Sequence, residues 1–142
     1  MLGTLELDAD RALYDRKVHS LVALCYEDER PLQGLAGILD WRFQGALSRG
    51  FKKGILTGQP GECAYIPVTR RENTYHLLLV GGGSLRKNGP RGKVPAETLQ
   101  MLRKNLLALR LQRVGISQSD FGNVDELWFI KHLKGVPLCI VR

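Results

Sequence analysis

The chain has 142 residues, of which 44% are hydrophobic and 25% charged, a composition typical of a globular protein with one buried core. No apolar run approaches the roughly 18 residues that a membrane span needs, and the acidic N-terminus lacks the basic head and apolar middle of a signal peptide. We therefore expect a single domain over residues 1–142, cytoplasmic and without membrane contact.

The net charge of +7 is unevenly distributed. Residues 41–113 carry 14 Lys and Arg against 3 Asp and Glu, whereas residues 1–40 carry 4 and 8. This cationic middle favours an anionic partner, such as nucleic acid, a nucleotide or an acidic protein surface. The alternative is a solvated basic face, because no aromatic residue interleaves the densest basic loop as a base-stacking platform requires. The candidate contacts to nucleic acid or another anion are Arg42, Arg49, Lys52, Lys53, Arg91 and Lys93.

Apolar runs bounded by turn residues predict the strands. In chain order, strands are expected over residues 2–7, 20–26, 62–68, 75–80, 115–117 and 136–141. Several of these runs are apolar throughout, which is typical of strands buried on both faces of a sheet. Pro67 places the third run at a sheet edge or near the end of its strand.

Apolar residues spaced three and four apart predict helices over residues 35–51 and 94–114. Gly37 and Gly45 weaken the first helix, and Gly50 is expected to end it. Residues 8–17 are expected to form a turn or one helical turn, and residues 125–133 a short helix after an Asp or Asn cap. Trp41 and Trp128 fall within helical patterns and are interpreted as core or interface anchors. Strands mixed with helices indicate a three-layer α/β/α sandwich with a mixed, mostly buried sheet.

The segment HLLLVGGGSLRKNGPRGK, residues 76–93, joins an apolar run to three glycines and a basic loop. It matches neither the P-loop nor the dinucleotide-binding fingerprint, because the required Gly and Ser or Thr positions hold other residues. A looser phosphate cradle remains open, built from the backbone of Gly81, Gly82, Gly83 and Ser84 with charge from Arg86 and Lys87. The alternative is the end of an interior strand followed by a surface loop.

Signals of catalysis are sparse. His19, His76 and His132 have no ligand-like spacing, and His76 is interpreted as a structural residue within a strand. The three cysteines lie in apolar runs, which is typical of buried thiols. No carboxylate cluster suits a metal pair. We expect no metal, no cofactor and no catalytic residues.

The segment GILTGQPGECAYIP, residues 54–67, places a T-G-x-x-G-E step before a strand, and HLLLVGGGS follows closely. With the helix that runs to Arg113 and the strand RVGIS, this succession resembles the N-terminal domain of the leucyl (cytosol) aminopeptidase family over roughly residues 18–118. The resemblance implies a macrodomain-like fold.

In that family the metal ligands and the catalytic Lys and Arg lie in a C-terminal domain with an N-T-D-A-E-G-R-L segment, which this chain lacks. The resemblance therefore implies a non-catalytic module that acts through protein contacts or self-association, in assembly or regulation, without peptidase activity. Two alternatives stay open: a nucleotide- or ADP-ribose-binding module, by analogy with macrodomains, and a nucleic-acid-binding protein.

Overall fold

The apolar runs form a six-stranded sheet in the computed structural model, which describes residues 3–4 and 8–141. The strands are β1 (Gly3–Thr4), β2 (Ser20–Cys25), β3 (Cys63–Arg70), β4 (Asn73–Gly81), β5 (Val114–Ser117) and β6 (Leu138–Val141). Their order is β1-β6-β5-β2-β4-β3, with every neighbouring pair parallel except β3, which runs antiparallel to β4 at the edge. The predicted mixed sheet is thus confirmed. Of the strand expected over residues 2–7, the described part is β1, and the other positions lie outside the described residues.

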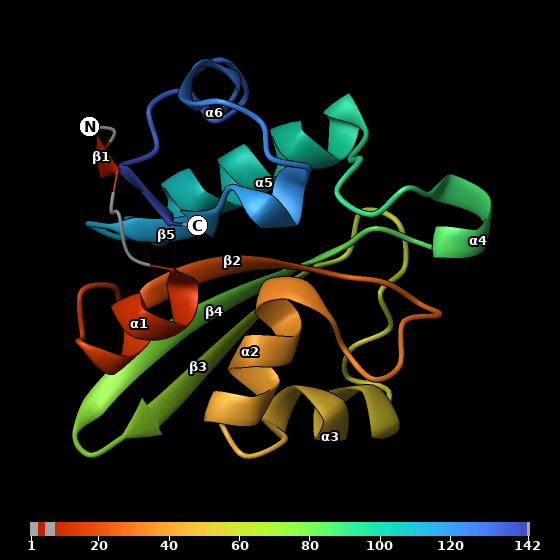
Figure 1. Cartoon of the computed structure of the whole chain (residues 1–142), viewed down its shortest axis with the longest axis horizontal. Coiled ribbons are helices and arrows are strands. Elements are labelled where there is room, and N and C mark those ends of the chain that lie inside the picture. The colour runs from red at the N-terminus through yellow and green to blue at the C-terminus, as the bar shows by residue number, and fades with distance from the viewer. Residues whose placement is uncertain (1–2, 5–7, 142) are drawn as a thin grey trace.

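Helices cover both faces of this sheet and complete three layers (Figure 1). The helices are α1 (Ala9–Tyr14), α2 (Gly34–Arg42), α3 (Ala46–Lys52), α4 (Leu85–Asn88), α5 (Ala96–Leu109) and α6 (Glu126–His132), with a 3₁₀ turn η1 (Ser119–Phe121). One face packs against α1, α2 and α3, and the other against α5, α6 and η1. The expected α/β/α sandwich is therefore the observed architecture.

Alternation along the strands divides the core into two halves. In β2, Leu21 and Ala23 belong to the half under α1 to α3, whereas Val22 and Leu24 belong to the half under α5 and α6. Both faces of β2 are buried because successive side chains of a strand point to opposite sides. This burial on both faces explains why the sequence of β2 is a nearly continuous apolar run.

The prediction of one helix over residues 35–51 is wrong. Two helices, α2 and α3, occupy this segment because Gln44 and Gly45 adopt left-handed φ angles of 56° and 79°. The carboxylate of Asp40 accepts hydrogen bonds from the amide and the hydroxyl of Ser48, which holds α3 against the end of α2. Gly50, the expected terminator, lies inside α3 and packs against Leu56.

Other expectations are met or corrected in detail. Asp125 caps α6 by accepting the amide of Trp128, as predicted. The short helix α4 was not expected after the glycines. Trp41 is not a core anchor, since 74% of it is exposed. Within residues 3–4 and 8–141, every helix is too short or too polar to serve as a membrane span.

Candidate functional site

The three glycines lie at the carboxyl end of β4, an interior strand between β2 and β3, as the strand-end interpretation predicts. Their amides donate hydrogen bonds to carbonyl oxygens of neighbouring loops: Gly81 to Glu62 at 2.7 Å, and Gly82 and Gly83 at 2.8 Å to Cys25 and Gly58. Three of the four backbone donors considered for a phosphate, the amides of Gly81, Gly82 and Gly83, thus have partners within the protein.

Close packing explains why two of these positions are glycine. A Cβ at Gly81 would lie 2.0 Å from the carbonyl oxygen of Gln59, and a Cβ at Gly82 would lie 2.3 Å from the ring of Tyr26. Both separations are far below van der Waals contact. The glycines therefore let the loop around Gln59 and the Tyr26 ring approach the end of β4.

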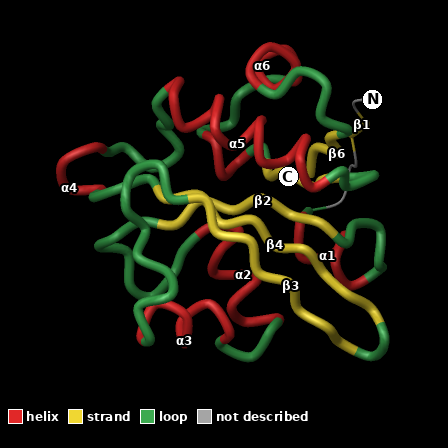
Figure 2. Tube along the Cα trace, turned by 180° about the vertical axis from the view of Figure 1, so that it is seen from behind, coloured by secondary structure: helices red, strands yellow, loops and turns green. Residues whose placement is uncertain are grey.

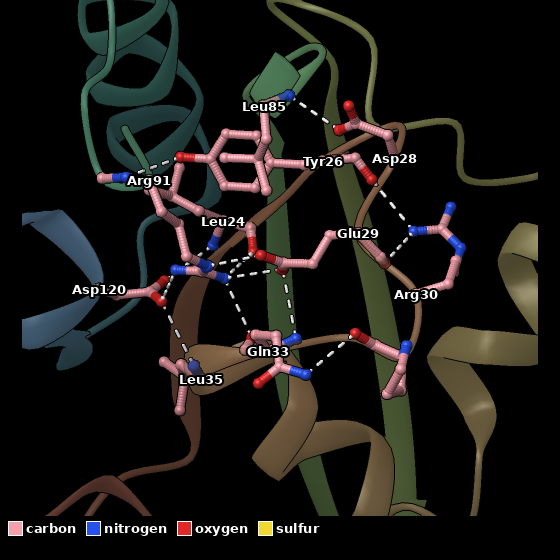
Figure 3. A network of polar contacts seen from close by, with 12 residues as sticks. Leu24, Tyr26, Asp28, Glu29, Arg30, Gln33, Leu35, Leu85, Arg91 and Asp120 are labelled. Carbon is pink, nitrogen blue, oxygen red and sulfur yellow. Dashed lines mark hydrogen bonds and ion pairs between the residues drawn. The ribbon is translucent and has the colours of Figure 1, made fainter. Parts of the chain in front are cut away.

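A carboxylate of the protein occupies the start of α4. Asp28 accepts a hydrogen bond from the Leu85 amide at 2.8 Å (Figure 3). It also accepts hydrogen bonds from the Ser84 hydroxyl at 2.9 Å and the Arg86 amide at 3.2 Å. The Leu85 amide is the main cause that lowers the pKa of Asp28 to about 2, assisted by the Arg86 amide and the Ser84 hydroxyl. Asp28 thus takes the Ser84 hydroxyl and the Arg86 amide, whereas the cradle prediction concerns the Ser84 backbone and the charge of Arg86, whose side chain is exposed.

Beside this turn lies a cavity of about 480 Å³, which we call the β4 cavity. It brings together four of the predicted ligand or anion contacts, Gly81, Gly82, Lys87 and Lys93, while Gly83, Ser84 and Arg86 are not part of its wall. Figure 2 shows long loops gathered at this end of the molecule, beside α4. The complete lining is Pro60, Gly81, Gly82, Lys87, Gly89, Lys93, Val94, Pro95 and Thr98.

The first turn of α5 also borders the β4 cavity. Thr98 in this turn is only 6% exposed and lines the cavity. Pro95 at the N-cap provides no side-chain hydrogen bond to the first amides of the helix. Such amides and the helix dipole favour an anion. Sequence reasoning missed Thr98, although the lysines flanking a Pro-started helix were a usable signal.

Arg91, expected as a surface contact, is instead an internal cross-link. Its Nε and one terminal nitrogen form a bidentate pair with Glu29 at 2.9 and 3.2 Å, and its other terminal nitrogen lies 2.6 Å from Asp120 (Figure 3). It also donates to the carbonyl oxygens of Leu24 and Gln33. Burial opposes the charge, but Glu29 and Asp120 outweigh it and raise the pKa of Arg91 above its ordinary value.

This cross-link lies where open α/β sheets usually bind ligands. The helices after β2 cover one face, α5 before β5 covers the other, and β2 and β5 are neighbours, so the strand order reverses between them. Asp120 follows β5 and Glu29 follows β2, and the Arg91 guanidinium joins them. This reversal of strand order is the topological switch point of the sheet. Its crevice is filled by the side chains of Arg91, Glu29 and Asp120.

The remaining candidate cations do not join the β4 cavity. Arg42 pairs with Asp10 through two hydrogen bonds of 2.5 and 3.0 Å and lines a hollow that Asn73, at the opposite end of β4, also borders. Arg49 and Lys52 belong to α3, and Lys53 is its C-cap. The cationic middle of the sequence is thus divided among different faces.

His76 and Cys25 fit structural roles, whereas Cys63, expected as a buried thiol, is only partly buried. The His76 ring contacts the Tyr65 hydroxyl at 2.6 Å, which agrees with the structural interpretation of this residue. Burial raises the pKa of Cys25 to about 12, so its thiol stays protonated near neutral pH. Among the described residues, no three His, Cys, Asp or Glu side chains gather as a metal site would require.

Comparison with known proteins defines the class of fold. No family model and no curated protein matches the amino-acid sequence. Among solved structures, the macrodomain of Mycobacterium tuberculosis DarG superposes with a TM-score of 0.66 at 15% identity, over 99% of this chain and 97% of that one. The macrodomain of Thermus aquaticus DarG gives 0.61 at 15% identity, over 100% and 98%.

A leucine aminopeptidase from tomato, in the K354E mutant form, superposes with a TM-score of 0.57 at 12% identity. The match covers 99% of this chain but only 32% of the tomato enzyme. The chain therefore has a macrodomain-like fold, as the resemblance implied. At these identities the likeness establishes the fold, and a specific origin in the aminopeptidase family stays a prediction.

We predict that Arg91→Ala lowers the free energy of unfolding by about 3–5 kcal/mol, because it leaves the buried carboxylates of Glu29 and Asp120 without their cation. Urea unfolding followed by circular dichroism measures the change. The matched control is Arg86→Ala on the exposed face of α4, which should cost no more than about 0.5 kcal/mol. Equal losses of unfolding free energy in both variants would show that the contacts of Arg91 with Glu29 and Asp120 stabilise the fold no more than an exposed arginine does.

Gly82→Ala should destabilise the protein by about 1–3 kcal/mol, because the new methyl group meets the Tyr26 ring. The Gly92 amide donates to the Tyr26 hydroxyl at 2.8 Å and hinders the ring from moving aside. The double variant Gly82→Ala/Tyr26→Leu should recover part of the loss. Thermal unfolding of the three chains tests this, and no recovery would contradict the proposed collision.

The carboxyl carbon of Asp28 should titrate near pH 2 in an NMR experiment, because three donors stabilise its charged form. A lowered folded-state pKa adds stability above the ordinary value of 3.8, and this stability is lost as the pH falls toward 2. Ser84→Ala should move the midpoint upward. A midpoint at the ordinary value in the native chain would contradict the capping of α4 by Asp28.

Proposed function

We propose that the chain is a macrodomain-like module that binds a phosphate-bearing nucleotide of the ADP-ribose class in the β4 cavity. The observation that carries the proposal is the convergence of Lys87, Lys93 and the largely buried Thr98 on one cavity beyond the carboxyl end of β4. Two cations and a hydroxyl beside a helix N-terminus are suited to a phosphate group.

The shape and walls of the cavity are compatible with such a ligand. Its volume of about 480 Å³ falls within the range of roughly 300–1,000 Å³ that is usual for small-molecule sites. Pro60, Val94 and Pro95 supply apolar wall on which a ribose or a base can pack. Because Arg91 fills the switch-point crevice, the β4 cavity is the adjacent space with polar groups left for a ligand.

The structural neighbours support this proposal only by analogy of fold, since function belongs to sites and not to folds. A role in protein contacts, expected from the aminopeptidase resemblance, stays a prediction, for which Leu127 and Ile130, exposed on α6, offer apolar surface. The absence of peptidase activity also stays a prediction.

The test is isothermal titration calorimetry of the full chain with ADP-ribose, ADP and inorganic phosphate. We expect heat of binding with ADP-ribose, and a loss of affinity of at least about tenfold in Lys87→Ala/Lys93→Ala, because each lost charge-assisted hydrogen bond is worth about 1.5–3 kcal/mol. Thr98→Val, which keeps the side-chain shape, should weaken binding further. Silence of the native chain at millimolar ADP-ribose and ADP would overturn the proposal.

The matched control is Lys52→Ala/Lys53→Ala, which also removes two positive charges but does so at the end of α3, outside the β4 cavity. Its affinity should equal that of the native chain. If both double variants lose affinity equally, net charge and not the cavity governs binding, and the site assignment is wrong.

A further inference from the structure

Two hollows open at the end of the sheet where β2 and β4 begin, opposite the turn formed by Gly81, Gly82 and Gly83, which we call the glycine turn. The larger, of about 530 Å³, lies between the ends of α1 and α2 and the β3–β4 hairpin, and the smaller, of about 350 Å³, lies between the start of β2 and the segment after α5. The Tyr75 ring of the first stacks on the His19 ring of the second, with centroids 5.2 Å apart. The hollows therefore adjoin, and we call their joint surface the basic edge.

Cations gather on the basic edge. Arg16, Arg42, Arg70 and Arg71 line the larger hollow. Lys17, Arg110 and Arg113 line the smaller one. Among the described residues, Asp10, the partner of Arg42, is the only carboxylate in an ion pair with any of these cations. Glu72 in the hairpin turn and Asp15, which pairs with Arg11, are nearby acids, so a strong positive excess remains.

Exposed aromatic rings accompany these cations. Tyr14 is 65% exposed and Trp41 is 74% exposed, and the Arg42 guanidinium lies 5.4 and 5.3 Å from the centroids of the two rings. Asp10 holds Arg42 in this position through two hydrogen bonds. An exposed tryptophan beside a fixed guanidinium adds little to the core and offers a flat apolar face to a partner.

The sequence conceals this combination. The densest basic loop contains no aromatic residue, but the fold brings Tyr14 from α1 to the hollow lined by Arg70 and Arg71 of the hairpin, and Trp41 from α2 lies beside Arg42, which lines the same hollow. Figure 1 shows α1 and the hairpin at one end of the molecule and α4 at the other. The basic edge is thus separate from the β4 cavity.

We propose that the basic edge binds single-stranded nucleic acid. Guanidinium groups match phosphate geometry and can follow a backbone, and exposed Tyr and Trp rings can stack on bases. A duplex keeps its bases stacked inside and offers none to these rings, and an acidic peptide offers charge without flat rings. The basic edge combines arginines that form no ion pair among the described residues with exposed aromatic rings held beside Arg42, and this combination favours a single strand over both.

The test is fluorescence anisotropy with an end-labelled 12-nucleotide single strand of mixed sequence and the full chain at low salt. We expect binding that weakens steeply with salt, with a log–log slope near −3 for about four phosphate contacts. The Trp41 emission should be quenched on binding. Arg70→Ala/Arg71→Ala should lower the affinity by about tenfold or more, and Trp41→Ala by about tenfold, with Trp41→Phe retaining most of it.

The matched control is Lys87→Ala/Lys93→Ala, which removes two charges at the β4 cavity and should leave strand binding unchanged. Conversely, Arg70→Ala/Arg71→Ala should leave the calorimetry with ADP-ribose unchanged, so the two proposals fail independently. No binding at low salt would overturn the inference. So would equal affinity for a duplex or a polyglutamate peptide combined with a silent Trp41→Ala, because the surface would then act through charge alone.

Discussion

The contact on which the loops at the carboxyl end of the sheet depend is the burial of Arg91 between Glu29 and Asp120. A buried carboxylate is costly without a cation and hydrogen bonds, and Asp120, whose side chain is 0% exposed, obtains both. It accepts the amides of Leu24 and Leu35 in addition to the guanidinium. One side chain thus holds together the end of β2, the start of α2 and the turn after β5.

This network also constrains the residue type and backbone conformation of the nearby segments. A Cβ at Gly34 would lie 2.4 Å from an Asp120 oxygen, and Gly34 has a φ of +59°, so the first residue of α2 must be glycine for two separate reasons. Gly92, next to Arg91, has a φ of +96° and gives its amide to the Tyr26 hydroxyl. The segment carrying Arg91 is therefore fastened to the end of β2 and the residue after it, by the Arg91 guanidinium on Leu24 and by the Gly92 amide on Tyr26. A ligand at the switch point would have to displace all of these contacts, which is why the β4 cavity is the more accessible place for one.

Local patterns in the amino-acid sequence predict much of the fold but little of the candidate site. Uniformly apolar runs such as that of β2 correctly indicated strands buried on two faces. The break between α2 and α3 escaped the helical pattern, because a left-handed Gln44 is decided by the Asp40 and Ser48 contacts across the turn. Arg91 and Glu29 are 62 residues apart, so only the register of the assembled sheet reveals their pairing. The exposure of Trp41 likewise depends on which face of α2 the sheet covers.

The residues that resemble the aminopeptidase N-terminal domain have structural roles in this chain. The Glu62 carboxylate accepts the amides of Thr57 and Gly58 and the Thr57 hydroxyl, which closes the T-G-x-x-G-E loop on itself. Gly58 has a φ of +76°, and a Cβ there would lie 2.6 Å from the backbone of Tyr26. The motif thus lets this loop pack beneath the glycine turn at the end of β4. The residues that carry the resemblance build the scaffold, so they can recur in other proteins that share the fold. The β4 cavity and the basic edge are formed by other residues and can differ between such proteins. The resemblance is accordingly evidence for architecture, and any activity must be argued from Lys87, Lys93 and Thr98 at one end of the sheet and from the arginines and aromatic rings at the other.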